Sequence, residues 1–185
     1  MLASGKVNCG KCSSTVYFAA LFASKGKPES PVRPTTIVQW PESPSTAFPE
    51  AARVSPRFIA AHAEAERAHR LGLVELAGMG YRRALEVLVK DDAISRFPGS
   101  RETIEREALG SCIANRIDDP LVREAAKRLT WLGNDWAHYV RSWTQYDVDH
   151  MKTMLGMVAQ FLMMRASLER LPEEMPAGKK PREAS

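Results

Sequence analysis

The stretch from Ser55 to Leu171 constrains the fold most, because its apolar residues recur at helical spacing between residues that start and stop helices. Ser55 followed by Pro56 has the form of a helix start, an N-cap hydroxyl and then proline at the first helical position. Asp119 followed by Pro120 has the same form. We therefore predict an all-α bundle of about five helices, with helical segments at 56–71, 73–97, 101–117, from 120 through 141, and 145–171.

Two features of these segments predict how they pack. Gly78 and Gly80 cost the second helix stability relative to alanine, and the usual compensation is close approach by another helix. Flexible, apolar methionine side chains fill irregular core space, so we expect the methionines of the last helix to lie in the core. They are Met151, Met154, Met157, Met163 and Met164.

Residues 26–54 differ sharply in composition, because six prolines forbid a continuous helix or a central strand. These prolines are Pro28, Pro31, Pro34, Pro41, Pro44 and Pro49. We expect an extended arm docked on the helices through Trp40 and Phe48, with a simple linker as the alternative. Pro172 should stop the last helix, and residues 172–185 should form a disordered tail.

Residues 1–25 contain one CxxC pair, Cys9 and Cys12, before an apolar run of strand or short-helix character at Val16–Phe22. A structural zinc ribbon needs four ligands, usually from two such knuckles. This segment is therefore half of a zinc ribbon, and reduced surface thiols are an equally good interpretation. We predict no cofactor, with zinc bound only where other ligands complete the site.

The overall composition excludes some classes of protein. No apolar run is long enough to cross a bilayer and the N-terminus has no signal-peptide layout, so a cytoplasmic protein is expected. A net charge of +4 permits nucleic-acid binding but is also typical of an ordinary solvated surface. Walker loops, dinucleotide-binding glycine motifs and metal-ligand clusters are missing from the sequence, which argues against kinases, dehydrogenases and metalloenzymes.

The segment Arg128–Arg141 (RLTWLGNDWAHYVR) holds the best candidate site, because on a helix Asn134 and His138 lie four residues apart on one face. At about 100° per residue, one side of this helix is apolar and should face the core. It comprises Val122, Ala125, Ala126, Leu129, Leu132, Gly133, Trp136 and Val140. Lys127, Trp131, Asn134, His138 and Arg141 fall on the other side. That side is either an exposed surface, a contact for the arm, or a functional face that a partner or ligand covers.

The sequences GYRRALEVLVKD (Gly80–Asp91) and IDDPLVREAAKRLTWLGNDWAH (Ile117–His138) resemble the bacterial family called domain of unknown function 4145. That family is grouped with the HEPN superfamily of helical, often dimeric domains. The resemblance covers about 37–168 and implies an all-α HEPN-like fold and a homodimer. It also implies partners among restriction or phage-defence proteins, and a start upstream of Met1 that would supply the missing zinc knuckle.

Many HEPN proteins are metal-independent endoribonucleases with a motif of arginine, a polar residue, three variable residues and histidine. Asn134 and His138 match this motif, but Gly133 stands where the arginine belongs. One hypothesis is therefore a non-catalytic module that binds a partner protein or nucleic acid through a face including Lys127 and Trp131. The alternative is a toxin- or defence-type endoribonuclease in which His138 is the general acid/base, Asn134 orients the phosphate and Arg141 supplies the missing charge. The missing arginine favours the first hypothesis.

Overall fold

The computed structural model describes residues 2–8, 15–22, 34–40, 48 and 50–175. They belong to two units, Met1–Pro44 and Ser45–Ser185, which we call the sheet unit and the helical unit. The sheet unit is a three-stranded antiparallel sheet of β1 (Leu2–Asn8), β2 (Thr15–Phe22) and β3 (Pro34–Trp40), in the order β1-β2-β3. β2 is the central strand, with Val16 opposite Val7 and Tyr17 opposite Trp40.

This sheet corrects the expected boundaries at the N-terminus. The apolar run around Val16 is a strand, which the sequence had left open. Within the predicted arm at 26–54, residues 34–40 form β3, which pairs with β2, and residues 51–54 are helical. Pro34 begins an edge strand, where the missing N–H of proline costs no ladder hydrogen bond. Cys9, Cys12 and residues 176–185 lie outside the described residues, so the zinc-knuckle and tail predictions stay predictions.

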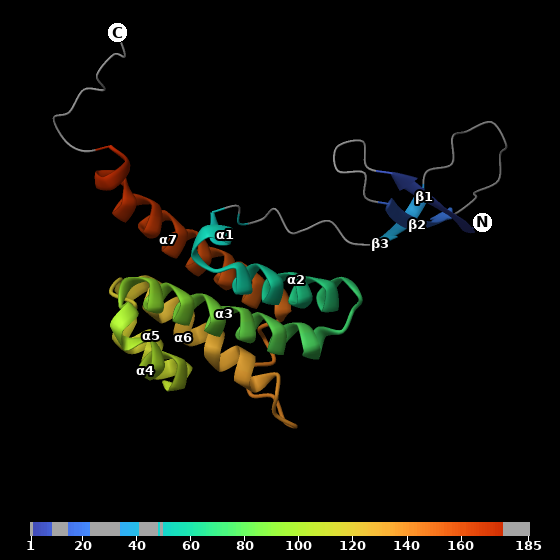
Figure 1. Ribbon diagram of the computed structural model, residues 1–185. Helices are drawn as coiled ribbons and strands as arrows, with labels where there is room; N and C mark the ends of the chain where they lie inside the picture. Colours follow the sequence, from blue (N-terminus) through green and yellow to red (C-terminus); the bar gives the residue numbers. More distant parts are fainter. Residues whose placement is uncertain (1, 9–14, 23–33, 41–47, 49, 176–185) are drawn as a thin grey trace, which may run out of the picture. The chain divides into compact units, whose positions relative to one another are not determined.

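The helical unit is all-α, as predicted (Figure 1). Its elements are α1 (Ala51–Val54), α2 (Pro56–Arg70), α3 (Val74–Arg96), the 3-10 turn η1 (Pro98–Ser100), α4 (Arg101–Arg106), α5 (Leu109–Arg116), α6 (Pro120–Asp135) and α7 (Val148–Glu174). Within the described part of the chain, no helix is both long and apolar enough to span a membrane.

Both predicted capped starts are confirmed. The Ser55 hydroxyl accepts a hydrogen bond from the N–H of Phe58 at 3.0 Å and donates to Asp91 on α3 at 2.6 Å. The Asp119 carboxylate accepts from the N–H groups of Leu121 and Val122, both at 2.9 Å. These bonds satisfy N–H groups that the first turn of a helix leaves without partners.

Two helix boundaries differ from the prediction. The expected helix at 101–117 is divided into α4 and α5 by Glu107 and Ala108, which are extended. The bend lets both short helices bury an isoleucine completely, Ile104 on α4 and Ile113 on α5. Pro172 does not stop the last helix, because α7 continues to Glu174. Proline at this position removes only one backbone hydrogen bond of the helix. Because the last turn of α7 is exposed, water can take the place of the missing N–H donor.

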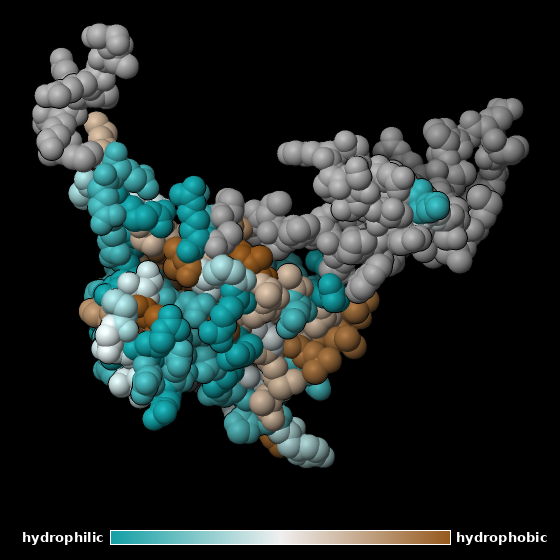
Figure 2. All heavy atoms as spheres, in the orientation of Figure 1, coloured by the Kyte–Doolittle hydropathy of each residue, from teal (hydrophilic) through white to brown (hydrophobic). Residues whose placement is uncertain are grey.

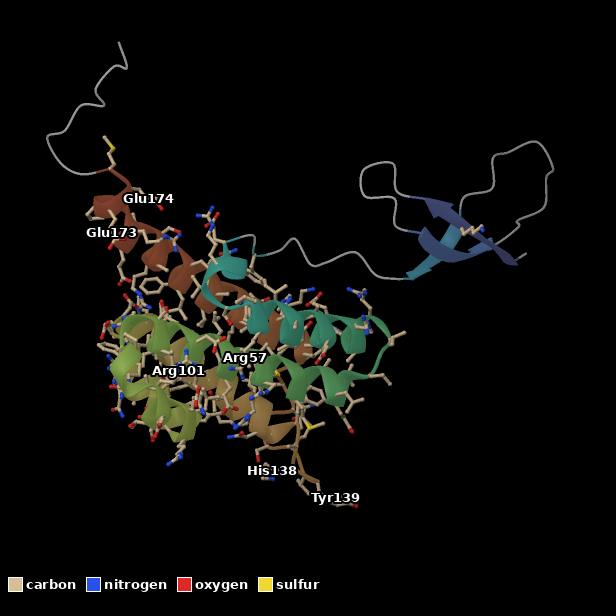
Figure 3. The ribbon with its side chains drawn as sticks, viewed as in Figure 1. Arg57, Arg101, His138, Tyr139, Glu173 and Glu174 are labelled. Atoms are coloured by element: carbon tan, nitrogen blue, oxygen red, sulfur yellow. The ribbon has the colours of Figure 1, made fainter. Side chains whose placement is uncertain are left out.

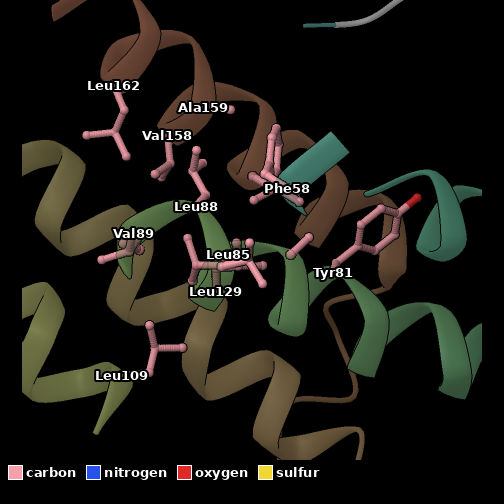
Figure 4. Close-up of a cluster of buried hydrophobic side chains, with 14 of the residues drawn as sticks. Phe58, Tyr81, Leu85, Leu88, Val89, Leu109, Leu129, Val158, Ala159 and Leu162 are labelled. Carbon is pink, nitrogen blue, oxygen red and sulfur yellow. The ribbon is translucent and has the colours of Figure 1, made fainter. Parts of the chain in front are cut away.

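The core of the helical unit surrounds α3, which packs against α2, α6 and α7. Figure 4 shows part of this cluster, including Phe58, Tyr81, Leu85, Leu88, Leu129, Val158 and Leu162. Phe48 packs on Phe58 and His62, as expected for an anchor of the segment before α1.

The predicted close approach at a glycine is confirmed at Gly80. A Cβ atom there would lie 2.9 Å from the Cβ of Ala65 on α2, well inside normal contact. The methionine prediction is partly wrong. Met151 and Met163 are buried in the core, whereas Met157 and Met164 are exposed.

Candidate functional site

The helix that was expected to carry Asn134 and His138 together ends before it reaches the histidine. α6 ends at Asp135, and residues 136–147, which we call the α6–α7 loop, connect it to α7. Asn134 is therefore in the last turn of α6, and Figure 3 shows His138 and Tyr139 on the loop, away from the body of the helices. The prediction that Asn134 and His138 lie on the same face of one helix is therefore wrong. The predicted apolar side is correct where α6 persists, with Ala126, Leu129, Leu132 and Gly133 buried, whereas Val140 is exposed.

Asp135 holds the α6–α7 loop in place. Its side chain is buried and accepts hydrogen bonds from the N–H of Ser142 at 2.7 Å and the N–H of Trp143 at 3.0 Å. The Arg141 Nε atom lies 3.6 Å from the same carboxylate. The hydrogen bond from Ser142, aided by Trp143 and Arg141, lowers the pKa of Asp135 below its ordinary value despite the opposing effect of burial. An ionised acceptor at this point stops the helix and turns the chain toward α7.

Arg141 stabilises the same loop and does not form part of an open phosphate site. Its guanidinium lies 3.5 Å from the centre of the Trp136 ring, and its Nη2 donates to the carbonyl of Tyr146 at 2.9 Å. The ring of Trp136 in turn covers Gly78 on α3, where a Cβ atom would lie only 2.5 Å from the indole. Trp136 and Arg141 therefore fix the start of the loop against α3.

Arg82 on α3 occupies the space that Gly133 leaves open. A Cβ atom at Gly133 would lie 2.4 Å from the Cβ of Arg82, so only glycine leaves room for this side chain. The Arg82 Nε atom donates to Oδ1 of Asn134 at 2.6 Å. A cation thus stands beside Asn134, although it comes from another helix. Sequence reasoning missed Arg82, because only the pairing of α3 with α6 brings the two residues together.

Three aromatic side chains on α6 and the α6–α7 loop surround a small depression, which we call the aromatic pocket. Trp131, Trp143 and Tyr146 are each between 39% and 48% exposed. The pocket has a volume of about 110 Å³, and its lining is completed by Arg128, Leu132 and Met154. The rings of Trp143 and Tyr146 lie 6.3 Å apart, a separation typical of interacting aromatic pairs.

Only one of these aromatic residues was predicted as a site residue. Trp131 was assigned to the functional face together with Lys127, which is half-buried and does not line the pocket. Trp143 and Tyr146 were missed because α6 was expected to run through Arg141. Their pairing with Trp131 depends on the loop that Asp135 closes.

A second polar cluster joins α2, α3 and α7. The Glu66 carboxylate accepts from the Tyr81 hydroxyl at 2.5 Å and from Lys152 at 2.8 Å. Burial acts to raise the pKa of Glu66, but the bonds from Lys152 and Tyr81 outweigh it and leave that pKa below its ordinary value. Burial also raises the pKa of Tyr81 and lowers that of His62, whose Nδ1 atom has no hydrogen-bond partner among the described residues. His62, Glu66 and Lys152 border an open groove of about 530 Å³.

A further apolar surface lies at the turn between α2 and α3, where Figure 2 shows hydrophobic residues gathered. Leu71, Leu73 and Leu76 are all exposed there. Within the ranges the structure describes, no three histidine, cysteine or acidic side chains gather in a way that could hold a metal ion.

Comparisons with protein-family models, with curated proteins and with solved structures find no match to this chain. The family resemblance therefore stays a prediction, and the features that indicate a function are the aromatic pocket and the α6–α7 loop.

Proposed function

We propose that this chain is a non-catalytic binding module that holds a partner protein through the aromatic pocket. The observation that carries the proposal is the exposure of Trp131, Trp143 and Tyr146 around one pocket on a loop that Asp135 fixes. Partly exposed tryptophan and tyrosine side chains beside an apolar recess are typical of the residues that dominate protein–protein binding. A fixed loop also reduces the entropy that binding must overcome.

The charges around the pocket favour a protein over a nucleic acid. Arg128 forms an ion pair with Glu124 at 2.6 Å, and Arg141 is held within the α6–α7 loop by Asp135 and Tyr146. Proteins that stack bases on aromatic rings also need a positively charged groove that follows the phosphates. Because the nearest cations already have partners, the pocket is better suited to an apolar side chain of a partner protein.

The catalytic alternative has one specific observation in its favour. Arg82 stands beside Asn134 and could supply the cation that Gly133 lacks. His138 would then act from the α6–α7 loop, outside the helix that holds Asn134. We prefer the binding module because the helix that was expected to align Asn134 with His138 ends between them, whereas the aromatic pocket is already formed.

The test uses peptides selected from a displayed random library against the wild-type chain and measured by calorimetry. We expect peptides with an apolar anchor, and we expect Trp143→Ala to weaken their binding by on the order of 30-fold, as for an interface hot spot. Tyr139→Ala is the matched control, because Tyr139 is fully exposed on the same loop and does not line the pocket.

Two outcomes would contradict the proposal. The first is equal binding of the selected peptides by wild type and Trp143→Ala, with both proteins folded by circular dichroism. The second is cleavage of a fluorescent RNA in the presence of a chelator that His138→Ala abolishes at unchanged melting temperature. The second outcome would establish the endoribonuclease instead.

A further inference from the structure

The open groove beside Glu66 lies between α2 and α7. Both helices pack on α3 but hardly contact each other, and the hydrogen bond from Lys152 to Glu66, at 2.8 Å, joins them. The groove has a volume of about 530 Å³. Sites for small molecules usually measure about 300–1,000 Å³, so this groove is large enough to hold one. None of its lining residues lines the aromatic pocket, so the two surfaces are separate.

One face of α7 forms a wall of this groove and is mostly polar. Its residues recur three and four positions apart, as residues on one side of a helix do. They are Asp149, Lys152, Thr153, Gly156 and Gln160. Gly156 leaves a hollow in the wall, because nothing lies within 4 Å of a Cβ atom added there. This face therefore suits a polar occupant better than an apolar helix.

The α2 wall contains a hydrogen-bond acceptor that no described residue satisfies. His62 is only 5% exposed, and its Nε2 atom lies 3.9 Å from the carboxylate of Glu66. The negative charge of Glu66 favours the imidazole proton on Nε2, which leaves Nδ1 as an acceptor. Nδ1 is buried and has no partner among the described residues. Buried polar groups nearly always have a partner, so the α2 wall is incomplete without an added donor.

The charges of the groove select the chemistry of its occupant. Glu66 and Asp149 are negative and Lys152 is positive, so the lining has a net charge of −1 while the imidazole is neutral. An anionic ligand would be repelled by the two carboxylates, and a cationic ligand would meet the ammonium of Lys152. A hydroxyl group both donates and accepts, so it can bond to the carboxylates, to the ammonium and to the neutral polar groups of α7.

We propose that this groove binds a neutral polyhydroxylated molecule of monosaccharide size. Its hydroxyl groups bond to Lys152, Thr153 and Gln160, and its carbon skeleton packs on the apolar side chains of Phe48 and Met157. For a ligand of this size we expect a dissociation constant of about 1 mM. This site does not require the partner protein proposed for the aromatic pocket.

The first experiment measures binding of D-glucose, D-galactose, D-ribose and myo-inositol to the full chain by saturation-transfer NMR. Each compound is titrated to about 10 mM, ten times the expected dissociation constant. At least one of the four should bind. Protonated glucosamine and glucose 6-phosphate should bind at least about tenfold more weakly than the best neutral compound, because of Lys152 and the two carboxylates respectively.

The second experiment locates the site with the compound that binds best. Gly156→Leu extends a side chain into the groove and should weaken binding by at least about tenfold, since the ligand loses its space. Gly110→Leu is the matched control, because Gly110 on α5 also has nothing within 4 Å of an added Cβ and does not line the groove. Thr153→Val should weaken binding by about fivefold through the loss of one hydrogen bond, and Thr103→Val on α4 should not.

Three results would overturn the proposal. The first is that none of the four neutral compounds binds at about 10 mM. The second is that glucosamine or glucose 6-phosphate binds more tightly than all of them. The third is that Gly156→Leu, shown to be folded by circular dichroism, binds the best neutral compound as tightly as wild type does.

Discussion

Substitution of Gly78 by alanine should disturb the start of the α6–α7 loop through Trp136. The new Cβ atom would lie 2.5, 2.6 and 2.9 Å from three atoms of the indole. The ring would have to retreat by about 1 Å to restore normal contact. It cannot do so freely, because the guanidinium of Arg141 lies 3.5 Å from its centre.

The expected magnitude follows from two opposing effects. Overpacking of this kind costs about 1–3 kcal/mol. Replacing glycine by alanine inside a helix recovers about 1 kcal/mol. Gly78→Ala should therefore lower the free energy of unfolding by about 1 kcal/mol. Gly156→Ala is the matched control, because Gly156 is inside α7 and nothing lies within 4 Å of its added Cβ. That variant should gain about 0.5–1 kcal/mol.

Thermal unfolding followed by circular dichroism separates the two variants. For a unit of this size, about 2 kcal/mol between them corresponds to roughly 4–8 °C in melting temperature, with Gly78→Ala the lower. Near-ultraviolet circular dichroism should also change for Gly78→Ala, since the environment of Trp136 is altered. A Gly78→Ala variant that melts with or above Gly156→Ala would refute the packing of Trp136 on α3.

Two further predictions concern buried polar groups of the core. Both carboxylate oxygens of Asp92 accept from the Nη2 atom of Arg165 at 2.5 Å. Asp92→Ala should cost about 3–5 kcal/mol in a urea titration by removing this partner, since the other partner of Arg165, Glu169, lies 3.5 Å from its Nε atom. A much smaller loss would mean that water or Glu169 replaces the lost contact. Burial lowers the pKa of His62 below 6.5, so at acidic pH the unfolded chain binds a proton at this histidine more readily than the folded chain does. The free energy of unfolding should therefore fall as the pH drops below about 6.5. His62→Leu should reduce the change in melting temperature between pH 7.5 and 5.5. If the change is the same as in wild type, other groups cause the pH dependence.

Sequence reasoning predicted the features of this protein that depend on neighbouring residues. The starts of α2 and α6 were correct because Ser55 and Asp119 cap N–H groups only two or three residues away. The all-α class was correct because helical periodicity is a property of each segment by itself. The close contact at Gly80 was also predicted, because an unfavourable helix residue needs a compensating neighbour.

The tertiary structure decided where α6 ends, and with it the candidate site. Residues 128–141 have a helical pattern throughout, yet the helix stops at Asp135 because its carboxylate finds the N–H groups of Ser142 and Trp143. Arg82 reaches Asn134 from 52 residues earlier in the chain. Contacts of this kind depend on how α3, α6 and the loop meet, and the spacing of residues within one helix carries no information about them. The sequence by itself therefore determined which segments are helical and where α2 and α6 begin, while packing between the helices determined where α6 ends and which side chains share a surface.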